Sequence, residues 1–303
     1  MKIAVADIGG TAVKCALYDR GKLLNMQEFP TEAHKGGKDV LERTMHAISA
    51  FPDFSAIGIS TTGQVNTDRG TIIFANDNLP DYTGTDVRAV FEKRFGVPTA
   101  VENDVNAAAL GEAHFGAGRG KKDFLMLTFG TGIGGAVITG GSLYTGSSFS
   151  AGEFGGIVTH PESMEKGVTF SGCYENYASV SALVREAEKI NPQLTNGKLI
   201  FKNISVPSVK ETVDAWIFEI ITGLVSLIHI FNPAAVLLGG GIMSQDDLID
   251  GIRTGIRPYL AGGFGETALM KAALGNQAGM MGAAVSARVY YKETEKSRKP
   301  SLL

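Results

Sequence analysis

The sequence predicts an α/β protein of two lobes, each built from three strands followed by helices. Residues 2–25 alternate apolar runs with Gly-Gly or Asp-Arg-Gly turns, which is typical of consecutive hairpin strands. From residue 121 the same order of strand, Gly/Thr turn, strand, Gly-Gly turn and strand returns, as an internal repeat. The 39 glycines cluster between such apolar runs, so they indicate tight turns whose backbone lies close to a ligand or to another segment.

The first lobe continues with alternating helices and strands. Leu41, Met45 and Ile48 recur at helical spacing and predict its first helix. We then expect a strand, a helix, a strand and a helix over residues 55–60, 86–95, 98–102 and 105–115. The glycine-rich, charged stretch at 116–122 predicts the boundary between the lobes.

The second lobe opens with the repeated strands and contains a long apolar stretch at 216–238, which predicts a buried helix and then a strand. A last helix near 279–291 is expected to pack back onto the first lobe. The predicted organisation is therefore a small N-terminal lobe (1–118), a large lobe (119–290) and a polar tail that frays (291–303).

Composition excludes several classes of protein. A net charge of −3 and a pI near 6.0 offer no general attraction to nucleic acid or anionic lipid. Two cysteines far apart do not form a disulfide framework, and the first residues lack a signal-peptide core, so a cytoplasmic protein is expected. Glu219, His229, Asn232 and Pro233 interrupt the apolar stretch, which argues against a membrane span.

The first candidate site is the Asp-Ile-Gly-Gly-Thr turn at 7–11, with Lys14 close behind it. Glycines let backbone N–H groups approach phosphate oxygens, and a hydroxyl adds a donor. The carboxylate of Asp7 could hold a magnesium ion through water. An ordinary tight hairpin would explain this turn equally well if it stood alone.

A second turn at 130–135, Gly-Thr-Gly-Ile-Gly-Gly, repeats this chemistry at the same place in the second unit. Two equivalent phosphate-binding turns are difficult to explain by packing. We therefore expect these turns to bind phosphate groups.

The third candidate site is Glu102-Asn103-Asp104, at the carboxyl end of a predicted strand. The carboxylate of Asp104 could accept a proton from an attacking hydroxyl, and the amide of Asn103 could bind sugar hydroxyls. Both residue types also cap helices well, and the tripeptide alone does not decide between the two interpretations.

Taken together, DIGGT, ENDVNAAALGE, GTGIGG, AGEFGG and LLGGG resemble, in order, the ROK family of sugar kinases and related repressors. The resemblance implies the actin/hexokinase-like (ribonuclease H-like) ATPase fold, with two lobes around a central cleft. It implies ATP and Mg²⁺ as cofactors, a sugar substrate and a homodimer. It assigns Asp104 as catalytic base and, as sugar ligands, Gly63, Asn103, Glu153 and Glu175. It assigns to the nucleotide Asp7, Gly9, Gly10, Thr11, Lys14, Gly130, Thr131, Gly132, Gly239, Gly240, Gly241 and Gly279.

One departure from the family pattern concerns zinc. Zinc-binding members carry a His three residues after the first sugar-binding Glu and then three cysteines, where this chain has Gly156, Lys166, Val168 and Cys173. One thiolate cannot hold a tetrahedral structural site, so no structural zinc is expected. His160 is interpreted as a surface loop residue.

The expected activity is ATP-dependent phosphorylation of a hexose or hexoside, at the 6-hydroxyl. Because Gly156 would leave space near the anomeric oxygen, a β-glucoside or cellobiose-type substrate is favoured. Glucokinase and N-acetylmannosamine kinase are alternatives among kinases. A sugar-responsive regulator of the same family and a non-catalytic sugar-binding protein are alternatives from other classes.

Overall fold

The computed structural model describes residues 1–76 and 79–298, which form two compact units. The first comprises Met1–Arg119, Thr145–Ala151 and the chain from Asn276 onward. The second comprises Gly120–Tyr144 and Gly152–Gly275. The chain thus first leaves the first unit between Arg119 and Gly120 and returns to it twice, so neither unit is continuous in sequence.

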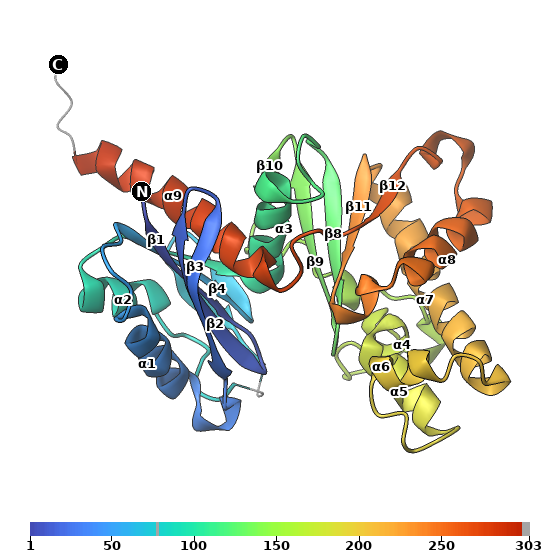
Figure 1. Cartoon of the computed structure of the whole chain (residues 1–303). Helices are drawn as coiled ribbons and strands as arrows, with labels where there is room; N and C mark the ends of the chain where they lie inside the picture. The colour runs from blue at the N-terminus through green and yellow to red at the C-terminus, as the bar shows by residue number, and fades with distance from the viewer. Residues whose placement is uncertain (77–78, 299–303) are drawn as a thin grey trace. The chain divides into compact units, whose positions relative to one another are not determined.

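The first unit is a five-stranded sheet with helices on both faces (Figure 1). Its strand order is β3-β2-β1-β4-β7; β2 runs antiparallel to β1 and β3, whereas β4 runs parallel to β1 and β7. Its elements are β1 (Ile3–Ile8), β2 (Ala12–Asp19), β3 (Lys22–Pro30), α1 (Gly37–Ile48), β4 (Ala56–Thr61), β5 (Gln64–Asn66), β6 (Thr71–Phe74), α2 (Val87–Phe95), β7 (Thr99–Asn103), α3 (Asp104–Phe115) and α9 (Ala278–Arg298).

The alternation of side chains along β1 explains why both faces of this sheet are covered. Ala4, Ala6 and Ile8 point into a core shared with α1 and α2. On the opposite face α9 packs against β1, β4, β7 and α3. Gly58 permits this approach, because a Cβ there would overlap the carbonyl of Ala283.

The second unit repeats this topology, with strand order β10-β9-β8-β11-β12. The duplication expected from the sequence is confirmed, since β8 pairs antiparallel with β9 and parallel with β11, as β1 does with β2 and β4. Its elements are β8 (Phe124–Phe129), β9 (Ile133–Thr139), β10 (Ser142–Tyr144), α4 (Glu175–Ala178), α5 (Val180–Glu188), α6 (Gly197–Lys202), α7 (Pro207–Phe231), β11 (Ala235–Gly239), α8 (Asp246–Ile256) and β12 (Ala268–Lys271).

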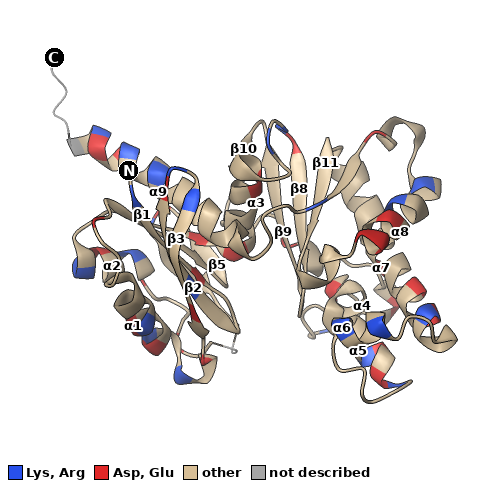
Figure 2. Ribbon diagram, viewed as in Figure 1, with Lys and Arg blue, Asp and Glu red and all other residues tan. Residues whose placement is uncertain are grey.

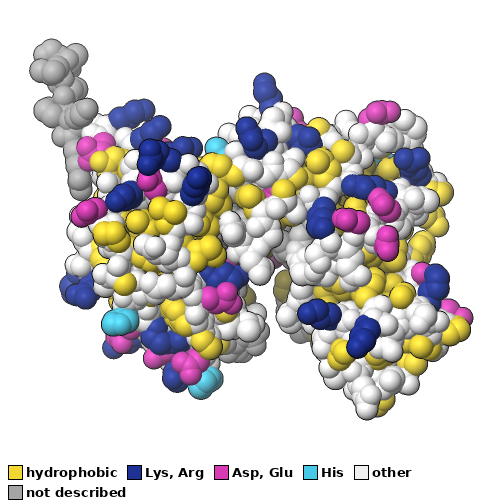
Figure 3. All heavy atoms as spheres, viewed as in Figure 1, with side chains coloured by type: hydrophobic (Ala, Val, Ile, Leu, Met, Phe, Trp, Pro, Cys, Tyr) yellow, Lys and Arg dark blue, Asp and Glu magenta, His cyan; other side chains and the backbone are white. Residues whose placement is uncertain are grey.

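Charge follows this architecture. Figure 2 shows Lys, Arg, Asp and Glu mainly on helices and turns, whereas β8 and β11 contain only uncharged residues. Asp7 is the one charged residue of β1. On the face seen in Figure 3, basic and acidic side chains are interspersed over each unit.

The long apolar helix α7 is the main interior element of the second unit. By length and composition alone it could cross a membrane, so the sequence-based argument against a span was too strict. Val213, Trp216, Ile220 and Leu224 are buried in the core of the unit, as in a soluble core helix.

The last helix differs from its predicted bounds. It begins at Ala278, one residue early, and continues to Arg298, through most of the segment expected to fray. Residues 299–303, the end of the predicted tail, lie outside the described residues.

Candidate functional site

The predicted residues fall into two groups, one in each unit. Asp7, Gly9, Gly10, Thr11, Lys14, Gly63, Asn103, Asp104 and Gly279 belong to the first. Gly130, Thr131, Gly132, Glu153, Glu175 and Gly239, Gly240 and Gly241 belong to the second. Each group is described within its own unit.

Strand register places polar side chains of the first unit in one row. Asp7 of β1 lies opposite Lys14 of β2 and Ser60 of β4, and Ser60 lies opposite Glu102 of β7. Ser60 Oγ donates a 2.6 Å hydrogen bond to Asp7 Oδ1. Burial raises the pKa of Asp7, although this bond and the charge of Lys14 oppose the shift.

The first glycine turn follows directly after β1. Gly10 and Thr11 are exposed, and no atom would meet a Cβ on Gly10 within 4 Å, so the tip of the turn is open. Gly9 N donates to Ala12 O at 3.1 Å and closes the turn. Its geometry suits an approaching anion.

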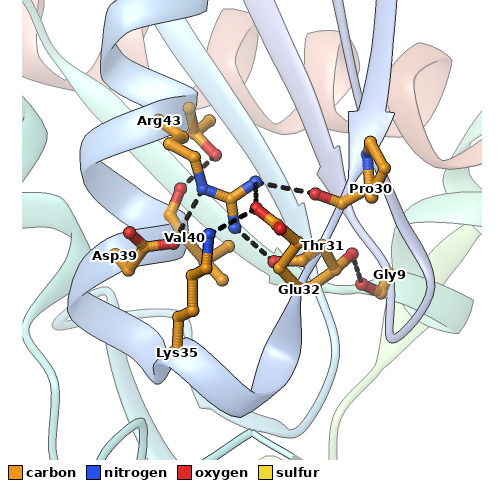
Figure 4. A network of polar contacts seen from close by, with 9 residues as sticks. Gly9, Pro30, Thr31, Glu32, Lys35, Asp39, Val40 and Arg43 are labelled. Carbon is orange, nitrogen blue, oxygen red and sulfur yellow. Dashed lines mark hydrogen bonds and ion pairs between the residues drawn. The ribbon is translucent and has the colours of Figure 1, made fainter.

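The turn is braced by a network that the sequence did not reveal (Figure 4). Thr31 Oγ1 donates to Gly9 O at 2.6 Å, and Thr31 N donates to Thr11 O at 2.9 Å. Arg43 of α1 in turn donates to the carbonyls of Thr31 and Pro30 and to the Asp39 carboxylate. Because these partners are far apart in sequence, no local motif marks them.

Asn103 caps α3, as one of the two interpretations of the tripeptide predicted. Its Oδ1 accepts from the N–H groups of Val105 and Asn106 at 3.0 and 3.1 Å. Its Nδ2 donates to Gly63 O at 2.9 Å and to Asp104 Oδ1 at 3.0 Å. These contacts occupy both amide protons and both acceptor sites, so a sugar must displace one of them to bind Asn103.

Asp104 is the first residue of α3, and its Oδ1 also accepts from Val105 N at 2.9 Å. Burial, followed by the negative charge of Asp7, raises the pKa of Asp104 to about 7. A carboxyl group with this pKa can exchange a proton near neutrality, which suits a general base.

Gly63 and Gly279 approach these residues closely. Gly63 has a φ of 92°, and a Cβ there would lie 2.7 Å from Phe74 O. Gly279 lies near the start of α9, where a Cβ would meet Asp7 Oδ1 at 2.6 Å and Ser60 Oγ at 2.9 Å. Gly279, which the resemblance assigns to the nucleotide, contacts the Asp7–Ser60 pair within the first unit.

Glu102 precedes this group and was given no separate role by the sequence. It is 6% exposed, and burial raises its pKa to about 7 although Asn103 N and Asn106 Nδ2 donate to its Oε1 at 3.0 and 3.3 Å. Within the described residues, Asn106 Oδ1 is buried without a hydrogen-bond partner.

Glu102→Gln is expected to stabilise the protein above pH 7. The folded state holds a proton that the unfolded state loses near the ordinary pKa of 4.5, so the free energy of unfolding falls as pH rises from about 4.5 to about 7. Because the glutamine amide does not titrate, Glu102→Gln should raise the free energy of unfolding by about 1 to 3 kcal/mol at pH 8 and change it little at pH 4. Urea denaturation at both pH values measures it, with the exposed Glu42→Gln as control. Equal effects at both pH values would contradict it.

In the second unit, the turn at Gly130–Gly132 occupies the position after β8 that the first turn occupies after β1. Glu175 lies against it: Ile133 N donates to Glu175 Oε2 at 3.3 Å, and a Cβ on Gly132 would lie 2.6 Å from the same oxygen. Burial and the charge of Glu175 raise the pKa of Glu153. The two predicted sugar-binding carboxylates are therefore near one another.

A cavity of about 1100 Å³ opens beside this turn. Phe129, Gly130 and Thr131 line one part, and Gly241 and Ile242 another. Gly240, with φ of 101°, packs on Phe129, and Gly239 is buried, so of these three glycines Gly241 lines the cavity. The residues that form the other walls were not predicted from the sequence. They lie on α5, on α6 and just before α6: Val180, Ser181, Val184, Arg185, Glu188, Thr195, Asn196, Gly197, Lys198, Phe201 and Lys202.

The loop that carries zinc in related proteins has other contacts here. Cys173 Sγ donates to Gly156 O at 3.2 Å. The space beside Gly156 is not empty, since a Cβ there would lie 3.0 Å from the Phe170 ring. No group of three or more His, Cys, Asp or Glu able to hold a metal ion occurs within residues 1–76 and 79–298.

His160 is a partly exposed loop residue, as expected, but its side chain has specific partners. Its two ring nitrogens hydrogen-bond Glu162 and Glu219, and its ring stacks on Tyr177. The sequence carries no signal for this cluster, because Glu219 is 59 residues away.

Comparisons with known proteins agree with the family resemblance of the sequence. The sequence model of the ROK family matches residues 3–289. A glucokinase of Streptomyces coelicolor is 34% identical over 93% of this chain and 96% of its own length. A β-glucoside kinase of Listeria innocua is 32% identical over 98% of this chain and 99% of its own. The crystal structure of a ROK family glucokinase from Streptomyces griseus with glucose and AMPPNP superposes with a TM-score of 0.83, at 32% identity, over 95% of this chain and 100% of that one.

Proposed function

Because this chain belongs to the ROK family, we propose that it is an ATP-dependent sugar kinase that phosphorylates a hexose or hexoside, at the 6-hydroxyl, with Asp104 as base. The observation that carries the proposal is the environment of Asp104. A carboxyl group with a pKa of about 7 is fixed at a helix N-terminus, in the unit that bears the first open glycine turn.

Asp104 accepts the proton of the attacking hydroxyl as the bond from that oxygen to the γ-phosphorus of ATP forms and the bond from phosphorus to the leaving ADP oxygen breaks. Val105 N holds its Oδ1, and Asn103 Nδ2 holds the same oxygen until the sugar binds. Asn103 exchanges its bond to Asp104 for one to the sugar, and Glu153 and Glu175 accept hydrogen bonds from other hydroxyls. Positioning of this kind contributes most of the catalysis of phosphoryl transfer.

The cavity of the second unit suits a nucleotide. Val180, Val184 and Phe201 provide an apolar wall for a base, and the exposed Thr131 presents its hydroxyl to phosphates. Gly241 has no side chain, so a nucleotide could approach the backbone closely on the opposite side of the cavity. The volume of about 1100 Å³ is ample for ATP.

Two carboxylates of the first unit could face a divalent cation that phosphates also bind. Burial and, second, the negative charge of Asp7 raise the pKa of Asp104, and a cation would relieve the repulsion between the two carboxylates. Asp7 would hold Mg²⁺ through water, and the ion would neutralise charge on the phosphates.

A β-glucoside or cellobiose-type substrate is favoured by Phe170. This ring is 47% exposed and lies against Gly156, three residues from Glu153. An exposed aromatic face can stack on a second sugar ring or on an aryl group.

Phe170→Ala is expected to raise KM for cellobiose or an aryl β-glucoside about 5- to 10-fold, because the stacking surface is lost. KM for glucose should change less than about twofold. Steady-state kinetics on both substrates measure the difference, and Phe218→Ala, exposed to a similar extent on α7, is the control. An equal effect on glucose would count against the β-glucoside preference.

The proposal is tested by a coupled ADP-release assay with magnesium-ATP and glucose, N-acetylmannosamine, fructose, cellobiose and an aryl β-glucoside. Activity lost in Asp104→Asn supports a kinase, and the preferred sugar decides between β-glucoside kinase, glucokinase and N-acetylmannosamine kinase. Tight, salt-sensitive retention of DNA would instead indicate a regulator. Sugar binding without ADP release would indicate a non-catalytic protein.

A further inference from the structure

His160 connects three segments of the second unit. Its Nε2 lies 3.0 Å from Glu219 Oε2 on α7, and its Nδ1 lies 2.8 Å from Glu162 Oε1 in its own loop. Its ring stacks on Tyr177 of α4, with centroids 3.6 Å apart and an interplanar angle of 23°. Because ionised carboxylates only accept hydrogen bonds, both contacts form together when the ring carries a proton on each nitrogen.

The loop that contains His160 is held by polar contacts. Residues 161–170 are all exposed; Ser171 Oγ bonds the backbone of Glu165 and Val168 within the loop, and Asn176 Nδ2 of α4 donates to Phe170 O at 2.6 Å. The base of the loop is closed by Thr159 N and His160 N, which donate to Gly172 O at 3.1 and 3.0 Å. His160 is therefore the side chain that ties this loop to α7.

The stack of His160 on Tyr177 lies close in sequence to Glu175, the predicted sugar ligand. Tyr177, under the His160 ring, is two residues after Glu175 on the single turn of α4. Tyr174 OH donates to Ile220 O at 2.7 Å, and Trp216 Nε1 donates to the carbonyls of Ala178 and Ser179, both at 3.0 Å. Helix α4 is thus bound to α7 at its two ends, and His160 adds a third link between them.

We propose that His160 is a positioning residue of the sugar site, whose bridge between Glu219 and Tyr177 fixes α4 and holds Glu175 in place for a sugar hydroxyl. This inference rests on the proposed role of Glu175. The His160 bridge would then order this loop, whose described residues include no group of three or more His, Cys, Asp or Glu able to hold a metal ion.

The kinetic test compares His160→Gln and Glu219→Gln. Each variant breaks a charge-assisted hydrogen bond, and KM for the sugar is expected to rise about 10-fold while kcat and KM for ATP change less than about twofold. Glu211→Gln, exposed on the same helix, and His46→Gln, exposed on α1, are matched controls. A fall in kcat with unchanged KM, or no change in either, would overturn the inference.

A second readout needs no activity. Trp216 is the single tryptophan, and its indole bonds the end of α4, so acrylamide quenching of its fluorescence reports this contact. Quenching should increase in His160→Gln and Glu219→Gln and remain unchanged in the controls. It should also increase in the unmodified protein as pH rises through the pKa of His160.

The direction of the pH effect follows from the neighbours of the ring. Partial burial lowers the pKa of His160, but the hydrogen bonds and charges of Glu219 and Glu162 outweigh it, and the net shift is upward. The facing groups are Glu162 from the loop, Glu219 from α7 and Tyr177 from α4. The stabilisation is thus complete below the ordinary value of 6.5 and is lost as pH rises through the higher value of the folded state.

The two readouts separate the inference from the proposed function. Unchanged quenching in both variants overturns the inference, whatever the kinase assay shows. Increased quenching with unchanged sugar KM overturns the role in the sugar site. If no sugar is phosphorylated by the unmodified protein, the proposed function fails, and increased quenching would still support the bridge from His160 to α4.

Discussion

Asp104→Asn is expected to reduce kcat about 10² to 10⁴-fold, equivalent to about 3 to 5 kcal/mol of barrier, while KM for the sugar changes little. The amide keeps the hydrogen-bonding shape of the carboxylate but cannot accept the proton of the attacking hydroxyl. In the unmodified enzyme kcat/KM should rise with pH through about 7 and then level off, because only the ionised form of Asp104 acts as base. Asp104→Asn should lose this dependence.

A matched control is available on α8. Asp247 is also an acidic residue in the first turn of a helix and is exposed. Asp247→Asn therefore removes a comparable helix-dipole interaction without removing a base. Steady-state kinetics at several pH values compare the two, and equal kcat values for them would exclude Asp104 as the general base.

Gly282→Ala is expected to destabilise the first unit by about 2 to 3 kcal/mol. A Cβ at this position would overlap the carbonyl of Ala107, so α9 and α3 must move apart. A Cβ on Gly111, on the facing helix, would similarly lie 2.5 Å from Ala278 O, so the helices touch through backbone on both sides. The loss should exceed the gain in helix propensity that alanine normally brings, about 1 kcal/mol.

Gly251→Ala on α8 separates propensity from packing. There a Cβ would make only ordinary contact, 3.9 Å from Ile217 Cδ1, so up to about 1 kcal/mol of stabilisation is expected. Chemical denaturation followed by far-ultraviolet circular dichroism measures both variants. A Gly282→Ala protein as stable as the parent would show that the two helices do not approach as closely as described.

The sequence predicted those parts of the fold that repeat or that alternate. The duplicated strands and Gly/Thr turns could be predicted because both copies carry the same local pattern, and α2 ends at Phe95 as expected. The helices α4, α5, α6 and α8 were not predicted. They are short, and their packing depends on partners distant in the chain rather than on a motif.

The site residues also divide into those that a local motif marks and those that only folding brings together. Asp104 and Asn103 could be selected because a strand end, a cap and a carboxylate coincide in three residues. The cavity walls from α5 and α6, the Arg43–Thr31 brace and the His160 bridge could not. Each joins residues from separate elements, and only folding brings them together.

The discontinuity of the first unit affects the order in which the protein can form during synthesis. Helix α9, which covers β1, β4 and β7, is encoded at the end of the chain. The N-terminal sheet therefore leaves the ribosome with one apolar face uncovered and must wait through synthesis of the whole second unit. The first unit can therefore be completed only after the second unit has been synthesised, unlike a domain that folds as soon as its own continuous segment emerges.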